Sequence, residues 1–259
     1  FGGGLCASLG VSLQRQGLLV GVVTLLVVLF FRTFLLPASD DIHEPEEAAE
    51  KTSRNPRIFY MLGAVGLCAA IIEGSAGDWG AVLITDDFGA TGLISSLPYI
   101  VFQTAMVIGR FSSDALTTRY GRASILLGCG LLAAIGLSAG LVIGGQVAIV
   151  IAWFLIGAGA SVVIPMVFSL AGSIAKKSYA GVIAPSQAVA TVTGISYSAF
   201  LIGPPVIGVV ADIISLRWAM LIPAFLALGI VVGARIAAGA EGSAERQSLS
   251  RGKQHETPV

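Results

Sequence analysis

Seven long apolar runs dominate the sequence and limit the folds that the chain can adopt. They lie at residues 17–36, 58–79, 91–111, 122–144, 146–173, 182–211 and 217–238. An α-helix needs roughly 20 apolar residues to cross the hydrocarbon core of a bilayer, and each run provides about that many or more. The apolar residues do not alternate with polar ones, and a spanning segment must satisfy its own backbone hydrogen bonds, so helices are favoured over barrel strands. The sequence therefore predicts an all-α, polytopic membrane helix bundle.

The composition excludes several classes of function. Hydrophobic residues make up 55% of the chain and charged residues only 12%, against about 25% charged in soluble domains. The net charge is zero, which gives no indication of a nucleic-acid partner. The cysteines Cys6, Cys68 and Cys129 lie singly in apolar runs, and His43 and His255 lie in polar segments. Because no metal-ligand spacing, phosphate loop or paired catalytic groups occur within the spans, we expect no cofactor, no metal and no enzyme activity.

The positive residues predict the orientation of the bundle, because Lys and Arg resist translocation and accumulate on the cytoplasmic side. Of the 15 positive residues, only Arg15 and Arg217 fall on one set of connections. The other set contains Arg32, Lys51, Arg54, Arg57, Arg110, Arg119, Arg122, Lys176, Lys177, Arg235, Arg246, Arg251 and Lys253. We therefore expect the second set and the C-terminus to be cytoplasmic, in a bacterial inner membrane.

Polar segments divide the chain into parts. Residues 37–57 are rich in acidic and basic side chains and predict a solvated cytoplasmic linker. Residues 239–259 are similarly polar and predict a disordered cytoplasmic tail. Residues 1–10 begin in the middle of an apolar, Gly-rich pattern. We expect them to be the end of a further helix, in a chain that is a fragment of something longer.

One charged stretch stands between two apolar runs. Residues 109–122, GRFSSDALTTRYGR, place three arginines and an aspartate at the expected cytoplasmic loop 112–121. Arg110 and Asp114 are four residues apart and could pair on a helix, while Arg119 and Arg122 could reach helix ends or lipid phosphates. The simplest explanation of these charges is a positive-inside signal.

The spacing also resembles a known signature. Gly109, Asp114, Arg119, Gly121 and Arg122 match the G-x4-D-x4-R-x-G-R cytoplasmic loop of the major facilitator superfamily. Further similarity covers residues 73–79, EGSAGDW, which resemble the seventh helix of facilitators related to fucose permeases, and residues 202–212, IGPPVIGVVAD, which are similar to the Gly- and Pro-rich eleventh helix.

The resemblance implies a particular domain organisation. If the charged stretch joins helices eight and nine, residues 1–36 are the end of helix five and helix six, and 37–57 is the central linker. Residues 58–238 are then the C-terminal six-helix bundle. The implied partners are the lipid bilayer, a small-molecule solute and the N-terminal half of the same transporter.

The function implied by the resemblance is secondary transport of a small solute by alternating access around a midplane site, with proton coupling as an option. In that architecture the charged stretch is a gate latch that holds the inward-closed state through its aspartate. Two alternatives stay open: a truncated half-transporter with no activity of its own, and a drug or metabolite exporter rather than a sugar-type importer.

Ionisable and polar residues at bilayer depth are expensive, so each is a candidate for function. Glu73 is the one carboxylate well inside an apolar run, and we expect it in the outer half of its helix, about 9 Å from the Trp79 end at roughly 1.5 Å per residue. Burial disfavours a charged carboxylate, so Glu73 could exchange a proton as access changes; a structural hydrogen bond is the alternative.

Other polar or aromatic residues could line a solute path. Tyr99 and Gln103 recur with Arg110 on one helical face, and Gln187 and Thr191 repeat this spacing on a later span. Trp153 lies inside its span, where it could contact solute. Packing between helices is the competing explanation for each of these residues.

Overall fold

The computed structural model describes residues 12–32, 56–179 and 182–255, with side chains described as far as Gly239. The chain divides into two compact units, residues 1–47 and 48–259. The first contains the helix α2 (Leu13–Phe31), which is mostly apolar after Gln16. The expected linker and the expected helix end at residues 1–10 fall almost entirely outside the described residues.

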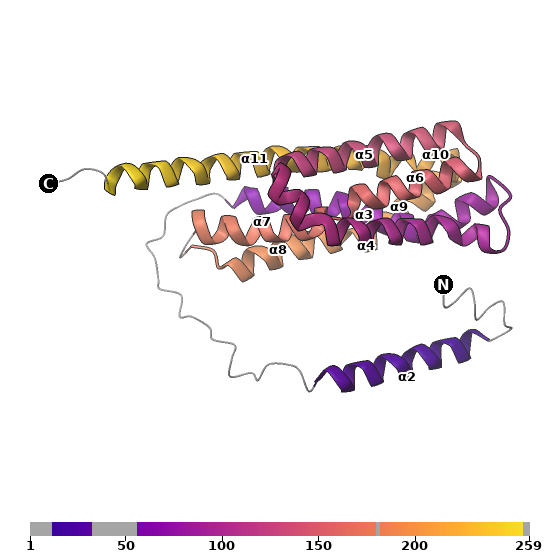
Figure 1. Cartoon of the computed structure of the whole chain (residues 1–259). Helices are drawn as coiled ribbons and strands as arrows, with labels where there is room; N and C mark the ends of the chain where they lie inside the picture. The colour runs from indigo at the N-terminus through magenta and orange to yellow at the C-terminus, as the bar shows by residue number, and fades with distance from the viewer. Residues whose placement is uncertain (1–11, 33–55, 180–181, 256–259) are drawn as a thin grey trace. The chain divides into compact units, whose positions relative to one another are not determined.

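The second unit is a bundle of helices that run alongside one another (Figure 1). Its elements are α3 (Arg57–Asp86), α4 (Leu93–Tyr120), α5 (Arg122–Ile143), α6 (Gln146–Ala160), α7 (Val163–Ser178), α8 (Pro185–Tyr197), α9 (Ala199–Ile214), α10 (Leu216–Ala219) and α11 (Leu221–His255). α3 packs against α8, α11, α4 and α9, and α5 packs against α11 and α6.

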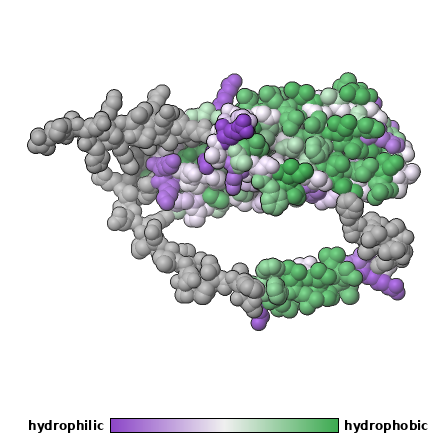
Figure 2. Space-filling model, viewed as in Figure 1, coloured by the Kyte–Doolittle hydropathy of each residue, from purple (hydrophilic) through white to green (hydrophobic). Residues whose placement is uncertain are grey.

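The prediction of seven membrane spans is confirmed within the described residues. The helices long and apolar enough to cross a membrane are Gln14–Phe31, Arg57–Asp86, Leu93–Tyr120, Arg122–Ile143, Gln146–Ser178, Pro185–Ile214 and Leu216–Gly239. The surface of the bundle face in Figure 2 is mostly hydrophobic, and large side chains such as Phe111 and Leu201 are more than 80% exposed. Such a surface suits lipid.

Two predicted segment boundaries are wrong. Residues 112–120, expected in a loop, are the last turns of α4, and Gly121 alone separates α4 from α5. No Gly or Pro interrupts 112–120, so polar residues there extend the helix instead of ending it. Residues 239–255, expected to be a disordered tail, continue α11 to His255, because their Ala, Glu, Arg and Gln favour a helix and the first proline comes at Pro258.

Two spans are interrupted at serine residues. The α6–α7 span breaks at Ser161 and Val162, and the α8–α9 span breaks at Ser198. The Ser161 hydroxyl donates a 2.7 Å hydrogen bond to the Ala158 carbonyl, and the Ser198 hydroxyl donates one of 2.6 Å to Ile195. These side chains compete with backbone donors for carbonyls of the preceding turn, which is how serine bends a helix.

Arg217 connects helix ends at the end of the bundle opposite Gly121. Arg217 of α10 donates from Nε to the Leu141 carbonyl at 2.8 Å and from Nη2 to the Val142 carbonyl at 3.2 Å. Its guanidinium also lies over the Phe88 ring, 5.4 Å from the centroid. Arg217 thereby satisfies carbonyls at the C-terminus of α5, which have no partner within their own helix.

We expect Arg217→Ala to lower the stability of the folded protein in detergent by about 1–3 kcal/mol, because charged hydrogen bonds to helix-terminal carbonyls are lost. Thermal unfolding measured by intrinsic fluorescence checks this. Arg217→Lys keeps the charge and should recover only part of the loss, since Lys has no planar fork. An unchanged unfolding temperature for Arg217→Ala would show that water replaces the arginine at no cost.

Candidate functional site

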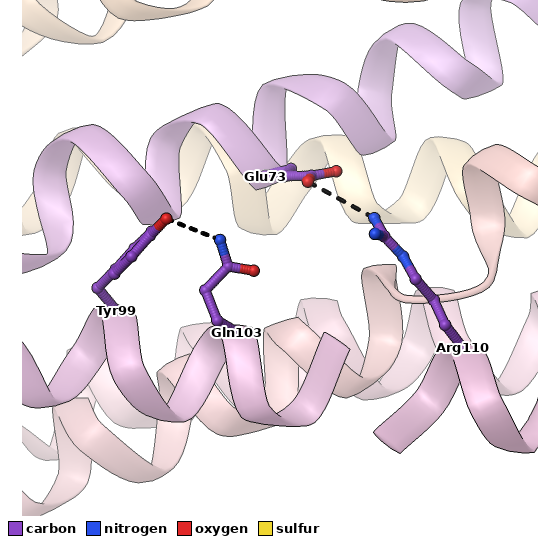
Figure 3. Close-up of polar contacts among 4 residues, drawn as sticks. All are labelled: Glu73, Tyr99, Gln103 and Arg110. Carbon is purple, nitrogen blue, oxygen red and sulfur yellow. Dashed lines mark hydrogen bonds and ion pairs between the residues drawn. The ribbon is translucent and has the colours of Figure 1, made fainter. Parts of the chain in front are cut away.

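The centre of the candidate site is an ion pair between two helices. Oε1 of Glu73, on α3, lies 3.6 Å from Nη2 of Arg110, on α4, and the two side chains point toward one another in Figure 3. Charge-assisted hydrogen bonds are typically about 2.7–2.9 Å long, so the charges face each other without a close contact. Among the described residues Arg110 pairs with Glu73, and not with Asp114, which could have paired with it on the same helix.

Glu73 lies near the middle of its helix. It is sixteen residues after Arg57 and thirteen before Asp86, or about 24 Å and about 20 Å from the two ends at 1.5 Å per residue. Glu73 is therefore slightly nearer the Asp86 end of α3, and it lies farther from that end than the roughly 9 Å counted from Trp79, because α3 continues for seven residues beyond Trp79. An ion pair at this depth is expensive unless both charges are used.

Two further polar residues extend this arrangement along α4. Nε2 of Gln103 donates a 2.9 Å hydrogen bond to the hydroxyl of Tyr99 (Figure 3). Tyr99 lies beside Gly77 of α3, where an added Cβ would be 3.8 Å from the ring. Glu73, Arg110, Tyr99 and Gln103, here called the polar strip, thus follow the contact between α3 and α4. All four are half-buried or exposed in the bundle.

Sequence reasoning missed an aromatic cluster on the other flank of α3. The rings of Tyr197 and Phe200 lie 5.9 Å apart, and Phe168 lies 6.2 Å from Tyr197. A Cβ at Gly74 would lie 3.3 Å from the Phe200 ring. Phe200 therefore packs against Gly74, the residue that follows Glu73 in the sequence. Tyr197 and Phe200 are 50% and 45% exposed. No sequence pattern distinguishes these rings from aromatic side chains that face lipid.

Three predicted path residues lie elsewhere. Trp153 is 0% exposed, and its indole N–H donates to the Ala76 carbonyl at 3.1 Å; it packs between α6 and α3. Thr191 donates to the Gln187 carbonyl at 2.9 Å. Thr191 lies nine residues before Phe200 on the same span, about 13 Å along it, so Gln187 and Thr191 are not brought to the polar strip.

The residues of the charged stretch 109–122 have separate structural roles. Gly109 lies within α4, where an added Cβ would collide with the side chain of Ser161. Gly121 has φ +79° and forms the tight joint between α4 and α5. Arg119 lies over the Tyr120 ring at 5.2 Å, and Arg122 is the first residue of α5.

Asp114 is exposed on the last part of α4. Its backbone carbonyl accepts a 2.8 Å hydrogen bond from the Thr118 hydroxyl, and no partner of its carboxylate is recorded among the described residues. The carboxylate is therefore available to groups outside this bundle.

The chain is similar to several transporters in sequence. It is 32% identical to an uncharacterised MFS-type transporter of Yersinia pestis over 90% of this chain and 59% of that protein. It is 32% identical to an uncharacterised transporter of Sinorhizobium fredii over 67% of this chain and 45% of that one. The membrane protein MosC of Rhizobium meliloti is 27% identical over 81% and 50%. The chain spans about half the length of the curated relatives it matches.

The bundle is also similar to solved structures. The major facilitator transporter FucP in its outward conformation aligns with a TM-score of 0.66 at 21% identity, covering 86% of this chain and 54% of that one. A variant of the E. coli fucose:proton symporter FucP aligns with a TM-score of 0.65 at 22% identity and the same coverage. These alignments confirm the predicted all-α membrane fold.

The family model described as the Major Facilitator Superfamily matches residues 1–186 and 83–257, which together cover nearly the whole chain. Its members are transport proteins rather than enzymes, as expected from the sequence. The resemblance carried by residues 109–122 is thereby confirmed: this integral membrane chain belongs to the Major Facilitator Superfamily.

Proposed function

We propose that the chain forms the second six-helix half, preceded by the sixth helix, of a secondary transporter that moves a small solute by alternating access. Residues 1–36 then end the first half, residues 37–57 link the halves, and residues 58–238 form the second bundle. Family membership and the share of each relative that is matched support this arrangement.

The observation that carries the proposal is the Glu73–Arg110 pair. Glu73 lies near the middle of α3, both side chains of the pair are partly exposed, and aromatic side chains flank α3 on the other side. A lipid-facing surface has no use for two charges at this depth, whereas a solute path does. Glu73, Tyr99, Gln103 and Arg110 are the residues we assign to that path.

The experiment is uptake by the complete transporter in proteoliposomes, with a panel of neutral, anionic and cationic small solutes. Saturable accumulation of one solute, lost in empty liposomes, is the expected result. Vesicles of opposite orientation separate import from export, and the chain expressed without a first half tests whether it is active alone. Absence of transport for every class would contradict the proposal.

We expect the C-terminus to face the cytoplasm of a bacterial inner membrane. In single-cysteine variants with Cys68, Cys129 and Cys6 replaced, Lys177→Cys at the end of α7 should react with an impermeant maleimide only after the cells are opened. Asp87→Cys, after the end of α3, should react in intact cells. The reverse pattern would invert the orientation.

Asp114 is proposed to act as a gate latch with a partner in the other half. Asp114→Asn should change the rate of transport several-fold while leaving solute binding within about two-fold, because a latch alters the balance of conformations and not the site. Transport rate and equilibrium binding are measured on the same preparation. Much weaker binding with unchanged open and closed populations would show that Asp114 belongs to the site.

A further inference from the structure

From the geometry around Arg110 we propose that the solute is a small carboxylate, and that its carboxylate group displaces Glu73 from Arg110 when it binds. This inference rests on the proposed transport function and adds to it the class of the substrate.

Arg110 has the donors that such a solute requires. A guanidinium carries five N–H donors in a planar fork that matches a carboxylate, and it stays charged. The contact recorded for Arg110 among the described residues is one approach of Nη2 to Glu73 at 3.6 Å, and half of its side chain is exposed. A second carboxylate can therefore reach the fork without displacing other protein groups.

Glu73 supplies the reason why the exchange is reversible. An arginine on a membrane-spanning helix with no anion nearby is costly, and Glu73 compensates for its charge when no solute is bound. Since the recorded separation exceeds that of a charged hydrogen bond, little directional bonding is lost when a solute carboxylate takes the place of Glu73.

The surroundings fit the rest of such a molecule. Tyr99 and Gln103 offer a hydroxyl and an amide on α4, toward the α3 position of Gly77. Tyr197 and Phe200 offer partly exposed rings on the other flank, against Gly74. Because Gly74 and Gly77 have no side chains, the rings of Phe200 and Tyr99 come close to α3 on either side of Glu73, where added Cβ atoms would lie 3.3 Å and 3.8 Å from them. A compact solute with one carboxylate and an apolar or hydroxylated body matches this surface.

Matched pairs of probes test the inference on the complete transporter. The pairs are lactate with propane-1,2-diol, gluconate with sorbitol, and benzoate with benzyl alcohol, each titrated by thermal shift in detergent and then tested by radiolabelled uptake into proteoliposomes. Inorganic phosphate serves as an anion without a carboxylate. We expect the anionic member of at least one pair to stabilise and enter, and its neutral counterpart and phosphate to do neither.

Variants then test the residues. Arg110→Gln should weaken binding of the carboxylate by about ten- to a hundred-fold, the range for losing a charged hydrogen-bonded partner, and Arg110→Lys should weaken it less. Glu73→Gln should strengthen binding several-fold, because the competitor for Arg110 is gone; a merely structural ion pair would give no gain. Arg235→Gln, an exposed charge on α11, is the matched control and should change nothing.

The outcomes distinguish failure of the carboxylate inference from failure of the proposed transport function. Neutral probes that enter as well as their anions, with Arg110→Gln unchanged, overturn the carboxylate inference and leave the transport function standing. Stabilisation by phosphate alone also overturns it, as does a wild-type protein that responds to no member of any pair while it transports another class of solute. If Arg110→Gln fails to yield monodisperse protein, the gain or absence of gain in Glu73→Gln decides.

Discussion

Replacing Gly109 by valine is expected to prevent the protein from folding into a monodisperse bundle. Any Cβ at this position meets the Oγ and Cβ of Ser161 at less than contact distance, so the larger side chain must force α4 away from the α6–α7 break. Overpacking at a tight helix contact costs about 1–3 kcal/mol or more. Size-exclusion chromatography and thermal unfolding in detergent measure the effect.

The same contact offers a rescue. In a Ser161→Gly background, Gly109→Ala should approach wild-type stability, because the next atom near the added Cβ is the Ala158 carbonyl oxygen at 3.8 Å. Gly128→Ala in α5 is the control, since nothing lies within 4 Å of its added Cβ. A Gly109→Ala single variant as stable as Gly128→Ala would show that α4 and the serine separate freely.

Glu73→Gln is expected to abolish proton-driven accumulation of the solute, so that the solute only equilibrates across the membrane. Glutamine keeps the shape and a hydrogen-bonding capacity but cannot bind or release a proton. Exchange of labelled for unlabelled solute, which needs no gradient, should persist. The comparison of gradient-driven uptake with exchange, at several external pH values, is the measurement.

That comparison distinguishes two possible roles of Glu73. If it is the coupling carboxylate, Glu73→Gln loses gradient-driven uptake and gains affinity for an anionic solute, since Arg110 is then permanently released. If it only balances Arg110 within the fold, accumulation and its pH dependence stay as in the wild type. A variant that loses exchange as well would place Glu73 in solute binding itself.

The spans were predictable because bilayer thickness fixes a minimum of apolar length, and each run meets it on its own. Their ends were not. Residues 112–120 follow the apolar run and are mostly polar, and polarity alone does not distinguish a helix that extends beyond the apolar run from a loop. The turn itself is indicated only by Gly121, which has a positive φ.

The sequence predicted several individual residues of the candidate site, but not which of them lie next to one another. Glu73 and Arg110 each stand out as charges near an apolar run, but they are 37 residues apart in the chain and Asp114 offers a nearer partner. Trp153 was misplaced because α6 is apolar on all sides, so the sequence does not tell which face is inside. Tyr197 and Phe200 were missed because exposed aromatics in a membrane helix look the same whether lipid or solute covers them.

The breaks at Ser161 and Ser198 lie at the level of the Glu73–Arg110 pair, since Ser161 faces Gly109 and Phe200 faces Gly74. Each interrupted span therefore consists of two short rods joined where the charges are, and not of one stiff rod. A bend at either joint would tilt α7 and α8, the helices on the Gly121 side of the joints, while α6 and α9 keep their angle. The Gly121 end of the bundle would then narrow or widen on its own, while Arg217 holds helix ends together at the opposite end.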